Sequence, residues 1–133
     1  MKIVHLVLSN VYAGIEQHVN ELVLNLEQES KTDVIIICNK EIASRFDGNN
    51  IQVINNFSRR SHIGLIKLLL KIHKIKTDII HTHRSKTTSI VNVIKKFLPI
   101  KHVATAHGIK NKTSVYKKAT KLITVSQIVK ESI

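Results

Sequence analysis

The chain has 133 residues, enough for one domain built around a single hydrophobic core. Apolar residues make up 43% of it and charged residues 23%, which excludes a disordered chain, and lysine and arginine total 21 against nine acidic residues. A single cysteine, Cys38, excludes an internal disulfide and any site built from several thiolates within the chain. The apolar run at the N-terminus is too short for a signal peptide or a membrane span, which predicts a soluble, cytoplasmic protein.

Apolar runs and helical patterns alternate along the chain. Residues 2–8 are almost continuously apolar, which predicts a strand buried on both faces, and apolar residues recur at helical spacing over 15–26. Five further strands are predicted at residues 33–38, 51–54, 78–81, 101–105 and 121–125. Further helices are predicted at 61–76, at 85–98 before Pro99, around Tyr116 and after Ser126, with a turn-rich loop at 39–50.

This order of elements predicts βαβ crossovers and a parallel sheet covered by helices on both faces, a Rossmann-like α/β three-layer sandwich. The sequence contains no internal repeat, low-complexity linker or domain boundary, so residues 1–133 are predicted to form one domain.

The net charge of +12 is concentrated in the second part of the chain. Residues 1–57 carry four basic and seven acidic side chains, whereas residues 58–133 carry 17 basic and two acidic ones. This asymmetry favours an anionic partner such as a phosphorylated substrate, an acidic lipid surface or nucleic acid. With five aromatic residues for stacking and no nucleic-acid-binding motif, nucleic acid is the weakest of these. The alternative is a solvated lysine-rich surface of the kind that low-GC genomes favour.

The predicted helix at 61–76 is both amphipathic and basic. We expect Ile66, Leu69, Leu70 and either His73 or Ile72 to face the sheet and the lysines to face solvent. The same pattern also suits adsorption to an anionic membrane surface, as a secondary electrostatic effect.

Ligands of parallel sheets bind beyond the carboxyl ends of the strands, so the residues that follow each strand are the candidates for a site. Gly14 lies after the first strand, at a helix start, where backbone N–H groups can approach a phosphate; alternatively it is only a turn residue. The surrounding residues match neither the GxGxxG fingerprint nor a P-loop.

Histidines follow two of the later strands. His81 and His83 share one face of an extended backbone, but no carboxylate or thiolate stands near them in sequence, so no metal is predicted. His107 follows the fifth predicted strand, where an imidazole can bond a sugar hydroxyl or stabilise developing charge; alternatively it is a surface residue in a turn. His5 and Cys38 are predicted to be buried in the core.

Four segments, taken in order, resemble the N-terminal domain of a GT-B glycosyltransferase of the family 4 (group 1) kind, and together they cover nearly the whole chain. They are MKIVHLVLSNVYAGIEQHVNELVLNLEQ, DIIHTHRSKTTSIVNVI, HVATAHG and KKATKLITVSQIVKESI.

The resemblance implies a hexosyltransferase that uses a nucleotide-sugar as substrate, retains the anomeric configuration and needs no metal or other cofactor. It also implies that this domain binds a glycan or lipid-linked acceptor of cell-envelope polysaccharide synthesis, in the cytoplasm or on the inner face of the membrane. The donor-binding C-terminal domain of such enzymes is absent from residues 1–133. It would belong to a longer chain or to a separate partner chain, and the isolated chain is expected to be inactive.

The resemblance assigns roles to particular residues. His107 is implied as the catalytic residue, which stabilises the transition state near the donor sugar and is not a nucleophile. The implied donor- and substrate-binding residues are Ala13, Gly14, Glu16, His83, Arg84, Gly108 and Ser126. Arg59 and Arg60 are the implied membrane or acceptor contacts. The family loop usually has two adjacent glycines, whereas here Ala13 holds the first position and restricts the backbone.

Two other functions stay open. The first is a non-enzymatic basic domain that binds an anionic membrane or nucleic acid. The second is the nucleotide-binding domain of another enzyme, such as a dehydrogenase. That possibility is disfavoured because GxGxxG is missing and Cys38, instead of an acidic residue, ends the second predicted strand.

Overall fold

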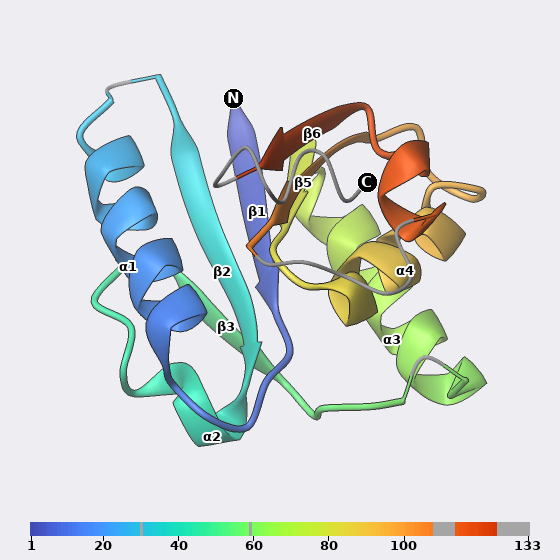
Figure 1. The fold of residues 1–133 in the computed structure, drawn as a ribbon, viewed down its shortest axis with the longest axis horizontal. Coiled ribbons are helices and arrows are strands. Elements are labelled where there is room, and N and C mark those ends of the chain that lie inside the picture. The colour runs from blue at the N-terminus through green and yellow to red at the C-terminus, as the bar shows by residue number, and fades with distance from the viewer. Residues whose placement is uncertain (30, 59, 108–113, 125–133) are drawn as a thin grey trace.

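The computed structural model describes residues 1–29, 31–58, 60–107 and 114–124 (Figure 1). Within these residues six parallel strands form one sheet in the order β3-β2-β1-β4-β5-β6. The strands are β1 (Lys2–Val7), β2 (Asp33–Asn39), β3 (Ile51–Ile54), β4 (Ile79–Thr82), β5 (Lys101–Ala106) and β6 (Lys121–Thr124). The helices are α1 (Gly14–Glu27), α2 (Lys40–Ala43), α3 (His62–Ile75), α4 (Ser85–Ile94) and the 3₁₀ helix η1 (Ser114–Lys118).

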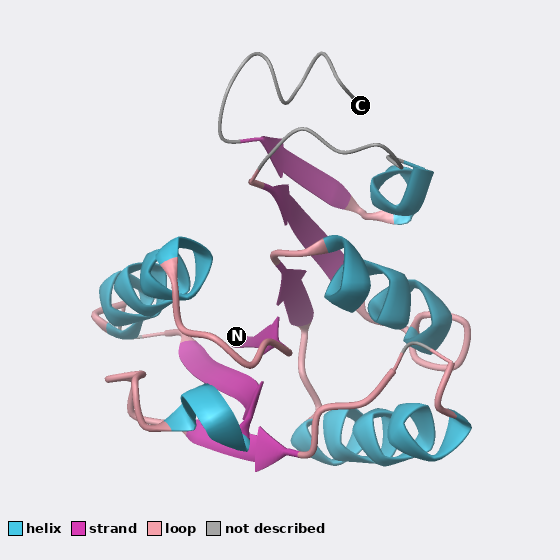
Figure 2. Ribbon diagram, turned by 60° about the horizontal axis from the view of Figure 1, so that its bottom comes forward, coloured by secondary structure: helices cyan, strands magenta, loops and turns pink. Residues whose placement is uncertain are grey.

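Helices cover both faces of the sheet, which confirms the predicted Rossmann-like three-layer sandwich. Helix α1 lies on one face, and α3 and α4 lie together on the other (Figures 1 and 2). The strand order reverses between β1 and β4, because β2 and β3 extend the sheet in one direction and β4, β5 and β6 in the other. The loops that follow β1 and β4 therefore diverge at the switch point, where this class of sheet binds its ligands.

Alternation along the central strands divides the core into two parts. Val4 and Leu6 of β1 pack with Leu68 and Ile90, on the side of α3 and α4. Val7 points to the other face and packs against α1. The continuous apolar run of β1 is thus explained by burial on both sides, as expected for a central parallel strand.

Helix α3 begins as predicted but buries only part of the predicted face. Ser61 caps it, because the backbone N–H of Gly64 donates to the Ser61 hydroxyl at 3.1 Å. Leu68 and Ile72 are the buried residues, Leu69 is partly buried against the core, and Ile66 and Leu70 are 55% and 61% exposed. The predicted inward positions of Leu69 and Ile72 are confirmed, and those of Ile66 and Leu70 are wrong. Apolar residues surround most of this helix, so their spacing alone does not select the face that meets the sheet.

Several element boundaries also differ from the prediction. The short helix α2 occupies part of the predicted loop at 39–50, and α4 ends at Ile94 rather than at residue 98. A tight turn follows, in which the Phe97 N–H donates to the Ile94 carbonyl at 2.9 Å, and Pro99 disfavours helical backbone at Leu98. Tyr116 lies in η1, as predicted. The helix predicted after Ser126 lies outside the described residues.

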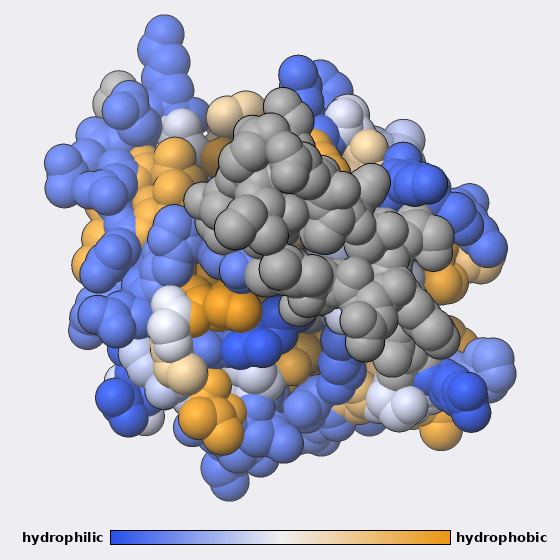
Figure 3. Space-filling model, in the orientation of Figure 1, coloured by the Kyte–Doolittle hydropathy of each residue, from blue (hydrophilic) through white to orange (hydrophobic). Residues whose placement is uncertain are grey.

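The visible surface is mostly hydrophilic, and apolar residues reach it in separate patches (Figure 3). None of the helices in the described part of the chain is both long and apolar enough to cross a lipid bilayer.

Replacing Gly64 with alanine should destabilise the fold, although alanine normally favours a helix. A Cβ at this position would lie 2.4 Å from Cγ of Phe57, so the ring would have to move. We expect Gly64→Ala to lower the free energy of unfolding by about 1–3 kcal/mol, measured by urea unfolding followed by circular dichroism. Gly14→Ala is the matched control, because a Cβ there meets nothing within 4 Å. Equal stability of the two variants would contradict the packing of Phe57 on α3.

Candidate functional site

The carboxylate of Glu16 joins the two loops at the switch point. Its side chain is fully buried, accepts a hydrogen bond from the Ser9 hydroxyl at 2.7 Å and accepts another from the Ala13 backbone N–H at 3.0 Å. Arg84, in the loop after β4, forms an ion pair with the same carboxylate at 2.7 Å. Glu16 therefore caps α1 and fixes the loop after β1 against the loop after β4.

Glu16 stays ionised in this setting. Burial acts to raise its pKa, but the hydrogen bonds from Ser9, Arg84 and the Ala13 N–H outweigh burial and lower the pKa of the carboxyl overall. One positive charge of the basic second half of the chain is thus neutralised by the acidic first half, inside the site.

A second polar network ties the remaining loops of this edge together. The side-chain carbonyl of Asn10 accepts hydrogen bonds from the amides of Asn39 and Asn56, each at 3.1 Å. Asn39 also donates to Glu41 at 2.7 Å, and Lys86 donates to the Asn56 carbonyl at 2.7 Å. Side chains at the carboxyl edge of the sheet therefore cross-link the loops after β1 and β3, the end of β2 and the start of α4.

Five histidines, which we call the histidine cluster, gather on the α1 side of β1, β4 and β5. His5 and His81 are register partners on neighbouring strands, and His83 lies two residues beyond His81 on the same face. His83 contacts His5 at 3.1 Å (Nε2 to Nδ1) and His107 at 3.3 Å (Nδ1 to Nε2). His18, on α1, completes the cluster, with its ring centroid 5.2 Å from that of His107.

The buried members of the cluster are neutral. Burial, aided by the nearby His81 and His18, lowers the pKa of His5 to about 3. Burial likewise lowers the pKa of His81 to about 4, with smaller contributions from neighbouring histidines, and holds the pKa of His83 far below its usual range. At neutral pH these rings are therefore uncharged donors and acceptors of hydrogen bonds.

Three of these rings bring nitrogens close enough to suggest a metal site. His5, His81 and His83 each offer one nitrogen, and these atoms lie within 4.8 Å of one another. The rings of His81 and His83 are stacked, however, with centroids 4.1 Å apart and planes inclined by 26°. Nε2 of His81 is hydrogen-bonded to Thr105 at 2.6 Å, and both ring nitrogens of His83 are already engaged with His5 and His107. We therefore assign no metal to these residues.

Gly14 borders open space beside this edge. A hollow of about 480 Å³ lies next to it, lined in part by Tyr12, Gln17 and Arg45. Gly14 has an ordinary negative φ, and an added Cβ would meet nothing within 4 Å. The fold itself therefore does not require a glycine here, which makes the position one that a ligand could approach closely.

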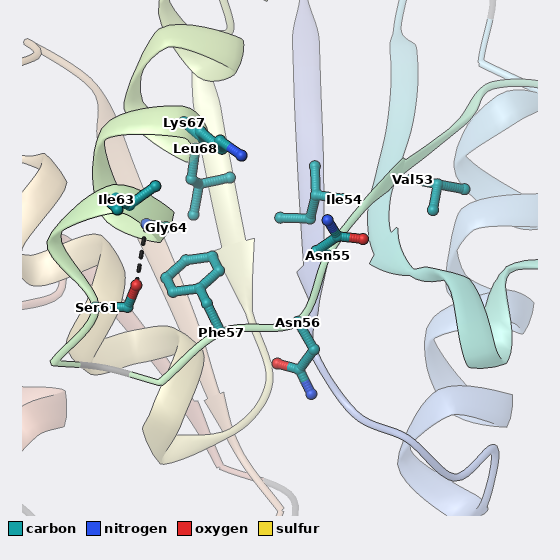
Figure 4. Close-up of a pocket in the computed structure, with 10 residues that line it drawn as sticks. All are labelled: Val53, Ile54, Asn55, Asn56, Phe57, Ser61, Ile63, Gly64, Lys67 and Leu68. Carbon is teal, nitrogen blue, oxygen red and sulfur yellow. Dashed lines mark hydrogen bonds between the residues drawn. The ribbon is translucent and has the colours of Figure 1, made fainter.

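A second cavity, of about 410 Å³, lies between the end of β3 and the start of α3 (Figure 4). Phe57 and Leu68 form part of its apolar lining, while Asn55, Ser61 and Lys67 supply polar groups. Asn56, which also lines it, connects this cavity to the network around Asn10.

Most of the residues singled out in the sequence come together. The structure gathers six of them around the loops after β1, β4 and β5: Ala13, Gly14, Glu16, His83, Arg84 and His107. Arg60 lies apart from them, exposed just before α3. Arg59, Gly108 and Ser126 lie outside the described residues.

Two sets of residues at this edge were not predicted from the sequence. One is the three asparagines Asn10, Asn39 and Asn56, whose signal was an asparagine at or just after the end of each of the first three strands. The other is His18, which lies one helical turn after Gly14 on α1 and so faces the same edge. His5 was expected in the core, but only the strand register shows that it contacts His83.

Comparison with known proteins identifies a family and a fold. The model of Glycosyltransferase Family 4 matches residues 12–133. No curated protein sequence matches the chain.

Several solved structures share the fold. The lipopolysaccharide outer core galactosyltransferase WaaB has a TM-score of 0.75 at 15% identity, over 99% of this chain and 41% of its own. Anabaena Alr3699/HepE, in complex with UDP, has a TM-score of 0.74 at 14% identity, over 99% and 40%. Acinetobacter baumannii MurG has a TM-score of 0.71 at 10% identity, over 93% and 41%. The chain thus spans about two fifths of the length of these proteins.

Acid should destabilise this protein steeply, beginning near pH 6.5. In the folded chain the pKa is about 3 for His5 and about 4 for both His81 and His102, whereas in the unfolded chain these side chains take up protons near pH 6.5. The unfolded state therefore binds more protons below that pH. Stability should fall by up to about 1.4 kcal/mol per pH unit for each such histidine.

Urea unfolding at a series of pH values between 7 and 4 measures this slope. His73→Gln is the control, since this histidine is exposed on α3 and its loss should leave the slope unchanged. A stability that stays constant between pH 6.5 and 5 would show that the buried histidines are not neutral in the fold.

Proposed function

The chain belongs to glycosyltransferase family 4, and we propose that it is the N-terminal, acceptor-binding half of a GT-B enzyme that transfers a sugar from a nucleotide-sugar. One observation carries this proposal: an open glycine and a histidine, Gly14 and His107, lie at the same edge of the sheet, in loops after β1 and β5. The Glu16–Arg84 ion pair holds the first of these loops in place. Such an edge suits a phosphorylated ligand whose sugar lies beside an imidazole.

The donor diphosphate is placed beside Ala13 and Gly14. Helix α1 begins here, so its first backbone N–H groups and the positive end of its dipole favour an anion. His107 then lies where it can contact the donor sugar and stabilise the transition state. The family resemblance extends the proposal to retention of the anomeric configuration and to catalysis without a resident metal or cofactor.

A second domain is part of this proposal. This chain covers about two fifths of each structure with the same fold, so those proteins are about two and a half times as long. We infer that a donor-binding domain faces the edge described above and completes the enzyme, either on a longer chain or on a partner chain. Residues 1–133 alone would then bind the acceptor side without turnover.

The acceptor is placed in the cavity between β3 and α3. Its apolar lining and polar rim suit an amphiphile such as a lipid-linked glycan of cell-envelope polysaccharide synthesis. On α3 beside it, Ile63, Ile66 and Leu70 are more than half exposed, and the intervening Lys67 is also exposed. This apolar and basic surface favours contact with an anionic membrane, which would place the protein at its cytoplasmic face.

Two substitutions test the donor site in a protein that contains a donor-binding domain. His107→Ala should lower kcat by about 10²–10³-fold, the cost typical of losing one group that stabilises the transition state. Gly14→Val should abolish transfer by occupying the space that the donor needs. Gly14→Val should leave stability nearly unchanged, since an added side chain at Gly14 meets open space.

Transfer from a panel of radiolabelled nucleotide-sugars to lipid and glycan extracts is the measurement, with His73→Ala as the control variant. Normal turnover in His107→Ala would remove this residue from the site. Wild-type protein that transfers none of the sugars, while still binding anionic vesicles in a salt-sensitive way, would favour the non-enzymatic alternative.

The membrane contact has a separate test. Ile66→Asp and Leu70→Asp together should weaken binding to vesicles that contain phosphatidylglycerol by at least about tenfold, because each apolar side chain contributes about 1.5–3 kcal/mol on burial. Cosedimentation measures binding, and Val11→Asp is the control, since Val11 is equally apolar and 68% exposed but lies in the loop after β1. Equal binding of all variants would rule out α3 as the membrane contact.

A further inference from the structure

His83 lies between two other histidines and is hydrogen-bonded to both. Its Nε2 is 3.1 Å from Nδ1 of His5, and its Nδ1 is 3.3 Å from Nε2 of His107. His5 is fully buried and His83 is 2% exposed, so bulk water does not compete for the bond between them. The row of three rings therefore runs from the middle of the sheet to the residue that follows β5.

The number of hydrogens in this row limits how it can be arranged. Each neutral imidazole carries one hydrogen and offers one lone pair, and burial keeps His83 neutral. His83 must therefore donate one of its two hydrogen bonds and accept the other. When His107 is neutral as well, two arrangements remain: if His83 donates to His5, all three rings carry their hydrogen on Nε2, and if it donates to His107, all three carry it on Nδ1. No other arrangement of three neutral rings makes both bonds.

His5 distinguishes between the two arrangements. Its Nε2 is buried and has no hydrogen-bond partner among the described residues. In the first arrangement this nitrogen would carry a buried N–H without an acceptor, which is the rarer and more costly kind of unsatisfied group. In the second arrangement Nε2 of His5 carries no hydrogen. The hydrogen at the other end of the row then lies on His107, which is partly exposed.

We propose that His83 is a positioning residue that holds His107 in the Nδ1–H tautomer, by donating its own Nδ1–H to Nε2 of His107. His5 orients His83 in turn, by donating from its Nδ1 to Nε2 of His83. The ring of His81 stacks on that of His83 with centroids 4.1 Å apart and is itself held by Thr105, so the His83 ring is kept from turning over.

This tautomer determines the chemistry open to His107. Its lone pair, on Nε2, accepts the hydrogen bond from His83, so while the row is intact the ring carries its hydrogen on Nδ1 and does not act as a general base through Nε2. The consequence for catalysis rests on the proposed function, in which that N–H would stabilise a sugar hydroxyl or developing negative charge. The tautomers themselves do not depend on it, so the two ideas can fail separately.

Long-range ¹H–¹⁵N correlation spectra of the ¹⁵N-histidine-labelled chain, recorded slightly above pH 7, report which ring nitrogen carries the hydrogen. We expect the Nδ1–H form for His5, His83 and His107. The exposed His62 and His73 serve as internal controls and should show the Nε2–H form that a free imidazole ring prefers. An Nε2–H form in any of the three rings of the row would overturn the proposal, and this result needs no variant that might fail to fold.

Two variants at position 83 test the positioning role. His83→Asn keeps a side-chain N–H near the position of Nδ1, whereas His83→Leu keeps volume but has no donor. His107 should stay Nδ1–H in the first variant and change to Nε2–H in the second. An unchanged His107 tautomer in His83→Leu would overturn the proposal.

The catalytic consequence is measured in a protein that contains a donor-binding domain. His83→Leu should lower kcat by about 10- to 100-fold with little change in KM, as for other residues that only orient a functional histidine, and His83→Asn should restore most of it. An equal loss in both variants would overturn the positioning role. The expected tautomers in a wild-type protein that transfers no sugar would overturn the proposed function and leave the tautomer assignment standing.

Discussion

The buried carboxylate of Glu16 is the interaction on which the site depends. An ionised carboxylate with no exposed surface is costly unless it is fully bonded, and here the Ser9 hydroxyl, the Ala13 N–H and Arg84 all bond to it. These partners come from the loop after β1 and the loop after β4, which the strand order drives apart at the switch point. The Glu16 side chain thus holds the two loops together at this edge of the sheet. Gly14 lies beside it and has room for a ligand.

The buried rings of the histidine cluster make this edge polar without adding charge to it. Its buried rings are held neutral by burial and by each other, so they add hydrogen-bond donors and acceptors to the site while the net positive charge stays on exposed lysines. This arrangement suits a ligand that is anionic at one end and rich in hydroxyls at the other. The same neutrality makes the fold vulnerable to acid, because the histidines that serve the site gain protons when the chain unfolds.

The layer order, the strands and most of the site could be predicted, because β-alternation and helical spacing report burial directly and the ends of parallel strands meet at one edge. The buried face of α3 could not, since Ile63, Ile66 and Leu70 look as apolar as Leu68 and Ile72, and only contact with the sheet distinguishes them. The row from His5 to His107 depends on register between strands that are more than 70 residues apart, which local patterns do not contain. The asparagine network was missed although an asparagine stands at or near the end of each of the first three strands, because only the fold shows that these side chains meet.

Binding of a nucleotide-sugar at the carboxyl edge around β1, β4 and β5 can be measured by titrating a ¹⁵N-labelled protein that contains this domain together with a donor-binding domain, followed by amide chemical shifts. Within residues 1–133 we expect shifts confined to the start of α1 around Gly14 and to the residues around His83 and His107. Shifts at the opposite edge of this domain, near Thr32, Asp78 and Ile100, or no shifts in this domain when millimolar ligand shifts the donor-binding domain, would contradict this placement of the ligand.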